Sequence, residues 1–290
     1  WPGEAIPAAT GGMLRRGADA VVMIEHADVD GSELRVGRAV TAGSAVSFAG
    51  TDITAGETVL RRGEILTSRD TGVLAAVGVG AIDVWRRPVV AIISTGDEII
   101  APGEPMQPAR VYDSNAQVLA DAVRELGGEP HRLGIVRDDA EALRAVVRQA
   151  IAAADIVLLS GGTSKGTGDV SYRVVAELRE PGIVAHGVAL KPGKPICLAA
   201  TRGRPVVVLP GFPTSAIFTF HEFVAPVLTA LAGRSVEQRN RVEATLAVRV
   251  NSEIGRTEYV LVGLVESGLG ARESGLGARD SGLGDSGLGA

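Results

Sequence analysis

Residues 160–169 combine a loop of serine, threonine and glycine with a closing acid, Asp169. The apolar segment 156–159 before this loop predicts a buried strand, and a helical pattern begins where the loop ends. Strand, glycine-rich turn and helix start together favour an anion, because free backbone N–H groups and the helix dipole attract negative charge. A carboxylate beside bound phosphates indicates a divalent metal or a proton-transfer role. Taken alone, the same residues are equally consistent with a plain turn and a capping acid.

Three further apolar segments also end in polar, glycine or proline residues. In an open α/β sheet, ligands collect outside the carboxyl ends of the strands, so such turns can share one crevice. We therefore expect the four strand ends to form one binding site rather than four unrelated turns. The three other predicted strands are residues 89–93, 132–136 and 206–209, and the turns that follow them are residues 94–98, 137–139 and 210–215.

The composition favours an α/β enzyme with an aliphatic core. The chain has 290 residues, of which 46% are hydrophobic and only 3% aromatic, as suits a parallel sheet covered on both faces. A net charge of −5 argues against nucleic acid or an anionic membrane as partner. The single cysteine, Cys197, lies in an apolar run and is interpreted as a core thiol. We see no apolar run near the roughly 20 residues of a membrane span and no signal peptide, and expect a cytoplasmic protein.

The pattern of elements predicts a central, doubly wound, mostly parallel sheet flanked by β-rich fragments. Expected helices are residues 68–77, 115–126, 140–153, 169–178 and 214–231, and short strands are expected in residues 1–56, 187–190, 237–250 and 256–265. The tail repeats Ser-Gly-Leu-Gly four times and is expected to be disordered. The predicted divisions are a β-rich domain (1–56), a connector (57–87), the α/β domain (88–235), a short β domain (236–265) and the tail (266–290).

Six short motifs in register carry a family resemblance. They are the Thr-Gly-Asp-Glu, Tyr-Asp-Ser-Asn, Arg-Asp-Asp, Ser-Gly-Gly, Lys-Pro-Gly-Lys-Pro and Pro-Gly-Phe-Pro motifs, which begin at residues 95, 112, 137, 160, 191 and 210. This series resembles the molybdopterin molybdenumtransferase family, the MoeA-type proteins that include the gephyrin E domain. The resemblance implies the MogA-like fold for the α/β domain. It covers residues 1 to about 265.

The resemblance implies the last step of molybdenum cofactor synthesis. Molybdate enters the dithiolene of adenylylated molybdopterin and AMP is released, with Mg²⁺ present. The implied catalytic residues are Asp169, Asp138, Glu98, Lys191 and Asp52, and Asp169 and Asp138 are the implied metal ligands. The residues implied to bind the pterin substrate are Thr10, Ser160, Gly161, Gly162, Ser164, Lys194, Pro210, Pro213 and Ser215. The resemblance also implies a homodimer in which the β-rich domain, with Thr10 and Asp52, reaches the cleft of the partner subunit, and it leaves open an association with the upstream adenylyltransferase.

The sequence departs from the family pattern at three positions. Gly187 stands where many relatives have a lysine, Phe212 replaces an amide side chain, and Lys165 lies inside the glycine loop. Two other functions fit the residues. One is a MogA/MoaB-type adenylyltransferase, which would transfer AMP to molybdopterin, and the other is a non-catalytic dimeric scaffold. The β-rich segment and the two proline-glycine motifs favour the metal-inserting enzyme over the adenylyltransferase.

Overall fold

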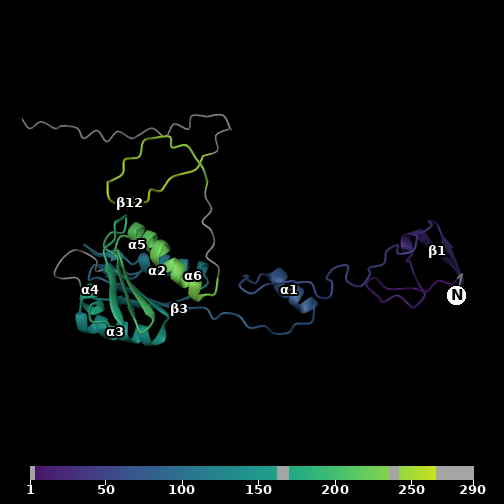
Figure 1. Cartoon of the computed structure of the whole chain (residues 1–290), viewed down its shortest axis with the longest axis horizontal. Helices are drawn as coiled ribbons and strands as arrows, with labels where there is room; N and C mark the ends of the chain where they lie inside the picture. The colour runs from purple at the N-terminus through teal and green to yellow at the C-terminus, as the bar shows by residue number, and fades with distance from the viewer. Residues whose placement is uncertain (1–3, 162–169, 235–241, 266–290) are drawn as a thin grey trace, which may run out of the picture. The chain divides into compact units, whose positions relative to one another are not determined.

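The computed structural model describes residues 4–161, 170–234 and 242–265. The chain divides into two compact units, Trp1–Ile82 and Asp83–Ala290, which are treated separately below (Figure 1). This division is coarser than the five segments expected from the sequence, and those finer boundaries stay predictions.

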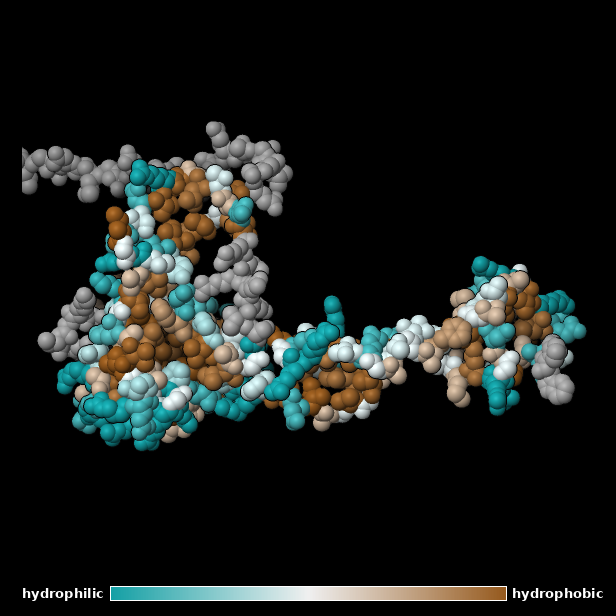
Figure 2. Space-filling view, viewed as in Figure 1, coloured by the Kyte–Doolittle hydropathy of each residue, from teal (hydrophilic) through white to brown (hydrophobic). Residues whose placement is uncertain are grey.

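The first unit contains little regular structure. A short 3-10 helix (Ile24–His26) precedes a hairpin of β1 (Ala27–Asp30) and β2 (Glu33–Val36), whose turn includes Gly31 at φ 61°. Helix α1 (Ser68–Ala76) begins with a capping box in which Thr67 and Asp70 satisfy each other's backbone N–H groups. The remainder of residues 4–56 is irregular, so the expectation of several strands there was wrong beyond this one hairpin. None of the described residues of this unit is buried, and apolar side chains lie on its surface in Figure 2.

The second unit is built on a six-stranded sheet in the order β6-β3-β7-β11-β10-β8. Its neighbouring strands β6 (Glu129–Val136), β3 (Val89–Thr95), β7 (Ile156–Ser160) and β11 (Arg204–Leu209) are parallel. Strand β10 (Cys197–Thr201) runs antiparallel between β11 and β8 (Pro181–His186). The predicted mostly parallel sheet is therefore confirmed, and Cys197 is buried in it as expected.

Helices cover both faces of this sheet. One core unites Val90 and Ile92 of β3 with α2 (Asn115–Glu125), α5 (Pro213–Thr219), a π-helix (Phe220–Val224) and α6 (Ala225–Leu231). The other unites Ala91 and Ile93 with α3 (Ala140–Ala153) and α4 (Val170–Val175). Successive β3 residues enter opposite cores because side chains alternate across a strand. The continuous apolar run in β3 thus follows from burial on both sides.

The remaining short strands were not all expected. Strands β4 (Ile99–Ile100) and β5 (Val111–Tyr112) form a small parallel pair. The strand expected over residues 187–190 was wrong, because β8 already ends at His186 and Gly187 turns the chain at φ 81°. Only β9 (Leu190–Lys191) follows, paired with β12 (Thr257–Glu258). Residues 242–250 contain no strand, so the expected second β domain is reduced to β12 in the described part of the chain.

One helical segment, Pro213–Leu231, has the length and hydropathy of a possible membrane span. The sequence reading had found no such run. The segment contains His221 and Glu222, and its buried residues Phe220, Val224 and Leu228 belong to the core against the sheet. Packing against the sheet therefore accounts for part of its apolar character, since 33% of the segment is buried.

Candidate functional site

The four predicted strand ends lie along one edge of the sheet. Strands β6, β3, β7 and β11 are consecutive neighbours and all parallel, so their carboxyl ends face the same way. Thr95 pairs with Val136, Ser94 with Ser160, and Ser160 with Leu209. The turns expected to share a crevice thus begin at adjacent positions of one sheet edge, as predicted. We call this region the strand-end edge.

Three acids gather where β3 and β6 end. The backbone N–H of Asp138 donates to Asp97 Oδ1 at 3.3 Å, and the N–H of Gly96 donates to the Val136 carbonyl at 3.3 Å. The Glu98 carboxylate lies over Gly96: a Cβ at Gly96 would be 2.6 Å from Glu98 Oε2. Within the described part of the chain, no basic side chain forms an ion pair with these acids.

The two neighbouring acids affect the pKa of Asp138. Partial desolvation is the largest cause that raises the pKa of Asp138, and the neighbouring charges of Asp97 and Glu98 raise it further. A partly desolvated carboxyl group beside other negative charges is stabilised by a proton or by a cation that offsets the local negative charge. Sequence reasoning selected Asp138 and Glu98, and the structure brings these two together.

The turn after β7 requires glycine. Gly161 has φ 111°, which other residues rarely adopt, and a Cβ there would overlap the Thr95 carbonyl oxygen. The Gly161 N–H donates to the Leu209 carbonyl at 3.4 Å. This glycine therefore allows the end of β7 to pack closely between the ends of β3 and β11. Its role here is steric, in addition to the pterin contact that the resemblance implies.

Asn115 is a site residue that sequence reasoning missed. Only its place in the Tyr-Asp-Ser-Asn motif was noted, with Ser114 as a possible helix cap. In the structure Ser114 makes no capping hydrogen bond through its side chain. Instead, the Asn115 side chain donates from Nδ2 to Ser160 Oγ and to the Gly211 carbonyl, each at 2.8 Å. The signal available in the sequence was a polar residue at the first position of an amphipathic helix.

The turn after β11 leads directly into α5. Pro210 is buried, and Pro213 takes the first helical position, where its missing N–H is not needed. Ser215 is half-buried, and its carbonyl accepts a hydrogen bond from Thr219 Oγ1 at 2.7 Å. Phe212 is 81% exposed between the two prolines. Pro210 and Pro213 thus both shape the helix entry at the strand-end edge.

Lys191 is not a free cation. Its Nζ lies 3.1 Å from Glu258 Oε1 and 3.3 Å from Glu253 Oε1. Hydrogen bonds to Glu258 first, and to Glu253 second, raise the pKa of Lys191. Backbone bonds from Thr257 N to the Ala189 carbonyl (2.9 Å) and from Tyr259 N to the Lys191 carbonyl (2.8 Å) hold these acids in place. We call residues 253–259 the C-terminal strap.

The second lysine of the predicted basic pair is arranged differently. Lys194 is exposed, and its carbonyl accepts from Val188 N at 2.9 Å. Between the two lysines, Gly193 has φ 117°, and a Cβ there would overlap Thr219 of α5. The Lys-Pro-Gly-Lys turn is therefore packed against the helix that starts at the strand-end edge. Sequence reasoning did not foresee the acidic partners of Lys191, because the strap is distant along the chain.

Several predicted site residues are not brought to this edge by the described structure. Gly162, Ser164 and Asp169 lie outside the described residues. Thr10 and Asp52 belong to the first unit, where both are exposed. Among the described residues no cluster of three histidine, cysteine or acidic side chains has metal-binding geometry. The expected pairing of Asp169 and Asp138 around a metal is thus untested, with only Asp138 described.

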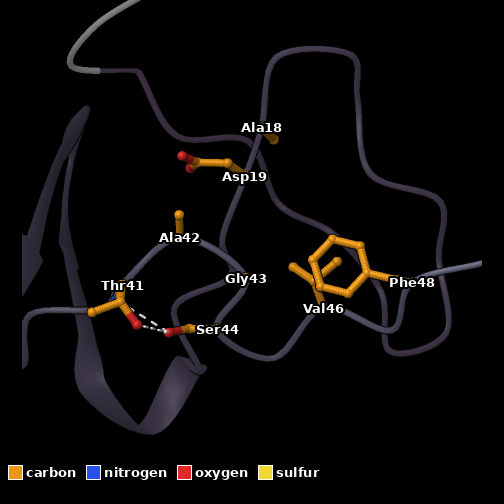
Figure 3. A pocket seen from close by; sticks show the side chains of 8 residues that line it. All are labelled: Ala18, Asp19, Thr41, Ala42, Gly43, Ser44, Val46 and Phe48. Atoms are coloured by element: carbon orange, nitrogen blue, oxygen red, sulfur yellow. Dashed lines mark hydrogen bonds between the residues drawn. The ribbon is translucent and has the colours of Figure 1, made fainter. Parts of the chain in front are cut away.

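The first unit carries a separate open hollow of about 700 Å³. Figure 3 shows its lining of small and apolar side chains, with the Phe48 ring overlapping Val46 in this view and Thr41 hydrogen-bonded to Ser44. Asp19 is the ionisable residue of this lining. A hollow of this composition offers no basic side chain to a phosphate, so we place the candidate site at the strand-end edge instead.

Comparison with known proteins identifies the class to which these features belong. Residues 91–230 match the family model described as "Probable molybdopterin binding domain", and residues 1–78 match "MoeA N-terminal region (domain I and II)". The α/β unit is thus of the class that this model describes, a probable molybdopterin binding domain. With the N-terminal match beside it, the chain belongs to the molybdopterin molybdenumtransferase, or MoeA, family.

Curated relatives and solved structures agree with this family. "Molybdopterin molybdenumtransferase 2" of Mycobacterium tuberculosis is 33% identical over 258 residues, covering 86% of this chain and 63% of that protein. The Nostoc molybdopterin molybdenumtransferase is 36% identical over 235 residues, 80% of this chain and 54% of the relative. A Pyrococcus horikoshii crystal structure titled as a molybdopterin biosynthesis MoeA protein shares 39% identity with a TM-score of 0.65, covering 77% of this chain and 55% of its own. The chain therefore spans less than two thirds of these relatives' length.

Proposed function

We propose that this chain carries the molybdate-inserting activity of its family: molybdate enters the dithiolene of adenylylated molybdopterin, and AMP is released. The observation that carries this proposal is that β6, β3, β7 and β11 are parallel neighbours, so that the four turns predicted to bind the substrate begin along one edge of the sheet. Family membership supplies the substrate class, since relatives are named molybdopterin molybdenumtransferases. An edge of this kind is the usual ligand position in an open α/β sheet.

The residues of the edge suit a substrate with phosphate groups. Ser160 and Thr95 are buried polar residues at the ends of β7 and β3, and Thr95 Oγ1 lies 3.1 Å from Ser171 Oγ, so the strand ends are polar beneath the turns. The glycine turn lets the substrate approach the backbone closely. Lys191 would supply positive charge once an anion competes with its acidic partners, Glu258 and Glu253. Fixed donors of this kind favour a phosphorylated ligand in a partly dry crevice.

We further propose that Mg²⁺ is held by Asp138, with Asp169 as a second ligand. The support is the electrostatics of Asp138: desolvation, and then the charges of Asp97 and Glu98, raise its pKa and make a cation favourable there, although these three acids do not form a metal-binding cluster among the described residues. Carboxylate oxygens are the ligands that Mg²⁺ prefers. When bound, the ion would offset pyrophosphate charge and polarise the bond that breaks. Asp97, whose Oδ1 accepts from the Asp138 N–H, would keep the Asp138 backbone in position.

The test is a comparison of two reactions with the purified chain. Incubated with adenylylated molybdopterin and Mg²⁺, it should release AMP only when molybdate is added. AMP release that ignores molybdate would contradict the proposal. Adenylylation of molybdopterin from ATP would instead assign the chain to the adenylyltransferase reaction. The N-terminal match over residues 1–78 favours the first outcome.

The proposal includes a cytoplasmic homodimer. The support is the exposure of apolar side chains in the first unit, which include Ile24, Val29 and Phe48. Apolar surface of this extent is typical of a region that another polypeptide covers. Sedimentation equilibrium should give twice the chain mass, and a monomer at micromolar concentration would contradict this part.

We also propose an association with the upstream adenylyltransferase. Co-sedimentation of the two proteins tests it.

A further inference from the structure

The C-terminal strap is held on the α/β unit at two places. Its backbone pairs with β9, where Thr257 N donates to the Ala189 carbonyl at 2.9 Å. In the same pairing, Tyr259 N donates to the Lys191 carbonyl at 2.8 Å. The Tyr259 hydroxyl also donates to Glu222 Oε2 at 2.7 Å, in the π-helix that continues α5. The strap therefore connects the lysine turn to the helix that starts at the strand-end edge.

The acids of the strap are placed on the ammonium group of Lys191. Glu258 Oε1 lies 3.1 Å from Lys191 Nζ, and Glu253 Oε1 lies 3.3 Å from it. Glu253 has a second cation, because Arg256 Nη1 lies 2.9 Å from its Oε2. For Glu258, Lys191 is the one basic partner found within the described residues, and its side chain is only 15% exposed. The charge of Glu258 thus depends on Lys191.

An anionic ligand and Glu258 compete for this lysine. The Lys191 side chain is 46% exposed, so a ligand can reach it. A carboxylate that is mostly removed from water is unfavourable without its compensating cation. An anion that draws Lys191 away would leave Glu258 in that state. Because β12 contains only two residues, its pairing with β9 has little stability of its own to offset this cost.

We propose that the C-terminal strap is a latch that a phosphate-bearing ligand opens. Glu258 occupies Lys191 in the closed chain, and the strap leaves β9 when the ligand takes the lysine. The use of Lys191 for a phosphate rests on the proposed function, whereas the latch rests on the contacts of Glu258 and Tyr259. Linkage makes the effect reciprocal, so a change that loosens the strap must strengthen ligand binding.

One substitution loosens the strap without changing any charge. Tyr259→Phe removes the hydrogen bond to Glu222 and keeps the ring stacked on Phe218, whose centroid lies 5.5 Å away. It leaves Lys191 and Glu258 intact. A gain in anion affinity in this variant therefore comes from the strap and not from a local change of charge.

The reciprocal effect is measured with inorganic pyrophosphate, by calorimetry on the full chain at constant ionic strength. Tyr259→Phe should tighten binding about threefold or more, because a larger fraction of the chain is then open to the anion. Glu258→Gln should also tighten binding, and Glu253→Gln less so, since Glu253 is the more exposed acid. Lys191→Gln should weaken binding about tenfold or more, and adding Tyr259→Phe to it should then give no gain.

Three outcomes of this titration would overturn the latch. They are an unchanged or weaker affinity in Tyr259→Phe, a gain that persists in the Lys191→Gln background, and a chain that binds no pyrophosphate with or without Tyr259→Phe.

The opening itself is measured by amide hydrogen exchange. Saturating pyrophosphate should speed exchange several-fold at the Thr257 and Tyr259 amides, which pair with β9, while amides inside β7 stay protected. Sodium chloride at the same ionic strength is the control for simple screening and should have a smaller effect. Bound pyrophosphate with unchanged exchange at these two amides would show that Lys191 moves alone, which overturns the latch.

The latch and the proposed function can fail separately. Molybdate-dependent release of AMP tests the proposed function. A chain that lacks this activity but opens its strap with pyrophosphate keeps the latch and loses the proposed function. An active chain whose strap does not respond to bound pyrophosphate loses the latch alone.

Discussion

Among the residues of the strand-end edge, Asp138 is a carboxyl group whose ionised form the folded chain disfavours. The raised pKa of Asp138 means that its ionised form is disfavoured in the folded chain, chiefly by desolvation and then by Asp97 and Glu98. The folded state thus binds this proton more tightly than the unfolded state. Between the unfolded and folded pKa values, this group makes the chain less stable as the pH rises. This loss of folding stability occurs at the pH values at which Asp138 must be ionised if it is to act as a carboxylate.

Replacing Asp138 by Asn should therefore separate stability from activity. We expect Asp138→Asn to unfold at the same or a slightly higher temperature at pH 7, with the difference vanishing below pH 3.8, the ordinary pKa of the group. Molybdate-dependent AMP release should fall by about 100-fold or more. Thermal melts across pH and a turnover assay check both parts. A destabilised variant with unchanged turnover would mean that Asp138 is only structural.

Gly161 gives a second prediction at this scale. Gly161→Ala meets the Thr95 carbonyl and also forces an alanine to φ 111°, whereas Gly203→Ala, at φ 77°, has no neighbour within 4 Å. Gly203→Ala should thus cost about 1 kcal/mol from backbone strain alone, and Gly161→Ala should cost clearly more. Denaturant unfolding of both variants measures the difference. Equal losses in the free energy of unfolding would show that the close packing at the end of β7 does not contribute to stability.

At the scale of elements, the sequence predicted most of the α/β order. The bounds of α3 were predicted to the residue, and those of α2 to within one residue, because both are amphipathic and bounded by polar turns. The strand expected at 187–190 was wrong, and residues 242–250 contain no strand, so that β12 is the strand described in the expected last β segment. A left-handed glycine ends β8 early, and β12 forms only by pairing with the distant β9. Such long-range pairing leaves no local pattern in the sequence.

The C-terminal strap gives the prediction for elements. Glu258→Gln removes the less exposed partner of Lys191, since the Glu258 side chain is 15% exposed and that of Glu253 is 53% exposed. Exposed ion pairs contribute little, so Glu253→Gln is the matched control. We expect Glu258→Gln to speed hydrogen exchange at the Thr257 and Tyr259 amides several-fold, with a smaller effect for Glu253→Gln. If neither variant changes exchange there, backbone pairing alone holds the strap.

At the scale of the whole molecule, the second unit depends on a sheet buried on both faces. Leu158 and Leu159 are neighbours on β7, each fully buried, but they enter opposite cores. Leu158→Ala and Leu159→Ala should therefore each lower the free energy of unfolding by about 2–5 kcal/mol. Denaturant titration measures both. A loss confined to one variant would contradict a sheet covered by helices on both sides.

The sequence could reveal the candidate site only in part, and for a physical reason. Motifs at the ends of strands predicted Glu98, Asp138 and Ser160 at one edge, because parallel strands bring their carboxyl ends together. Asn115 and the pairing of Lys191 with Glu258 depend on side chains meeting across the fold, which spacing along the chain does not encode. In Figure 1 the strap, which contains β12, has a colour near the yellow end of the scale, whereas β3 is teal, because the two are distant along the chain.

If the strand-end edge binds the nucleotide and the oxyanion together, a crystal of the chain soaked with AMP, molybdate and Mg²⁺ should show this most directly. Electron density for both ligands should then lie beside the ends of β3, β6 and β7, near Ser160 and Asp138. Density only in the hollow lined by Asp19 and Phe48, or elsewhere away from these strand ends, would contradict it.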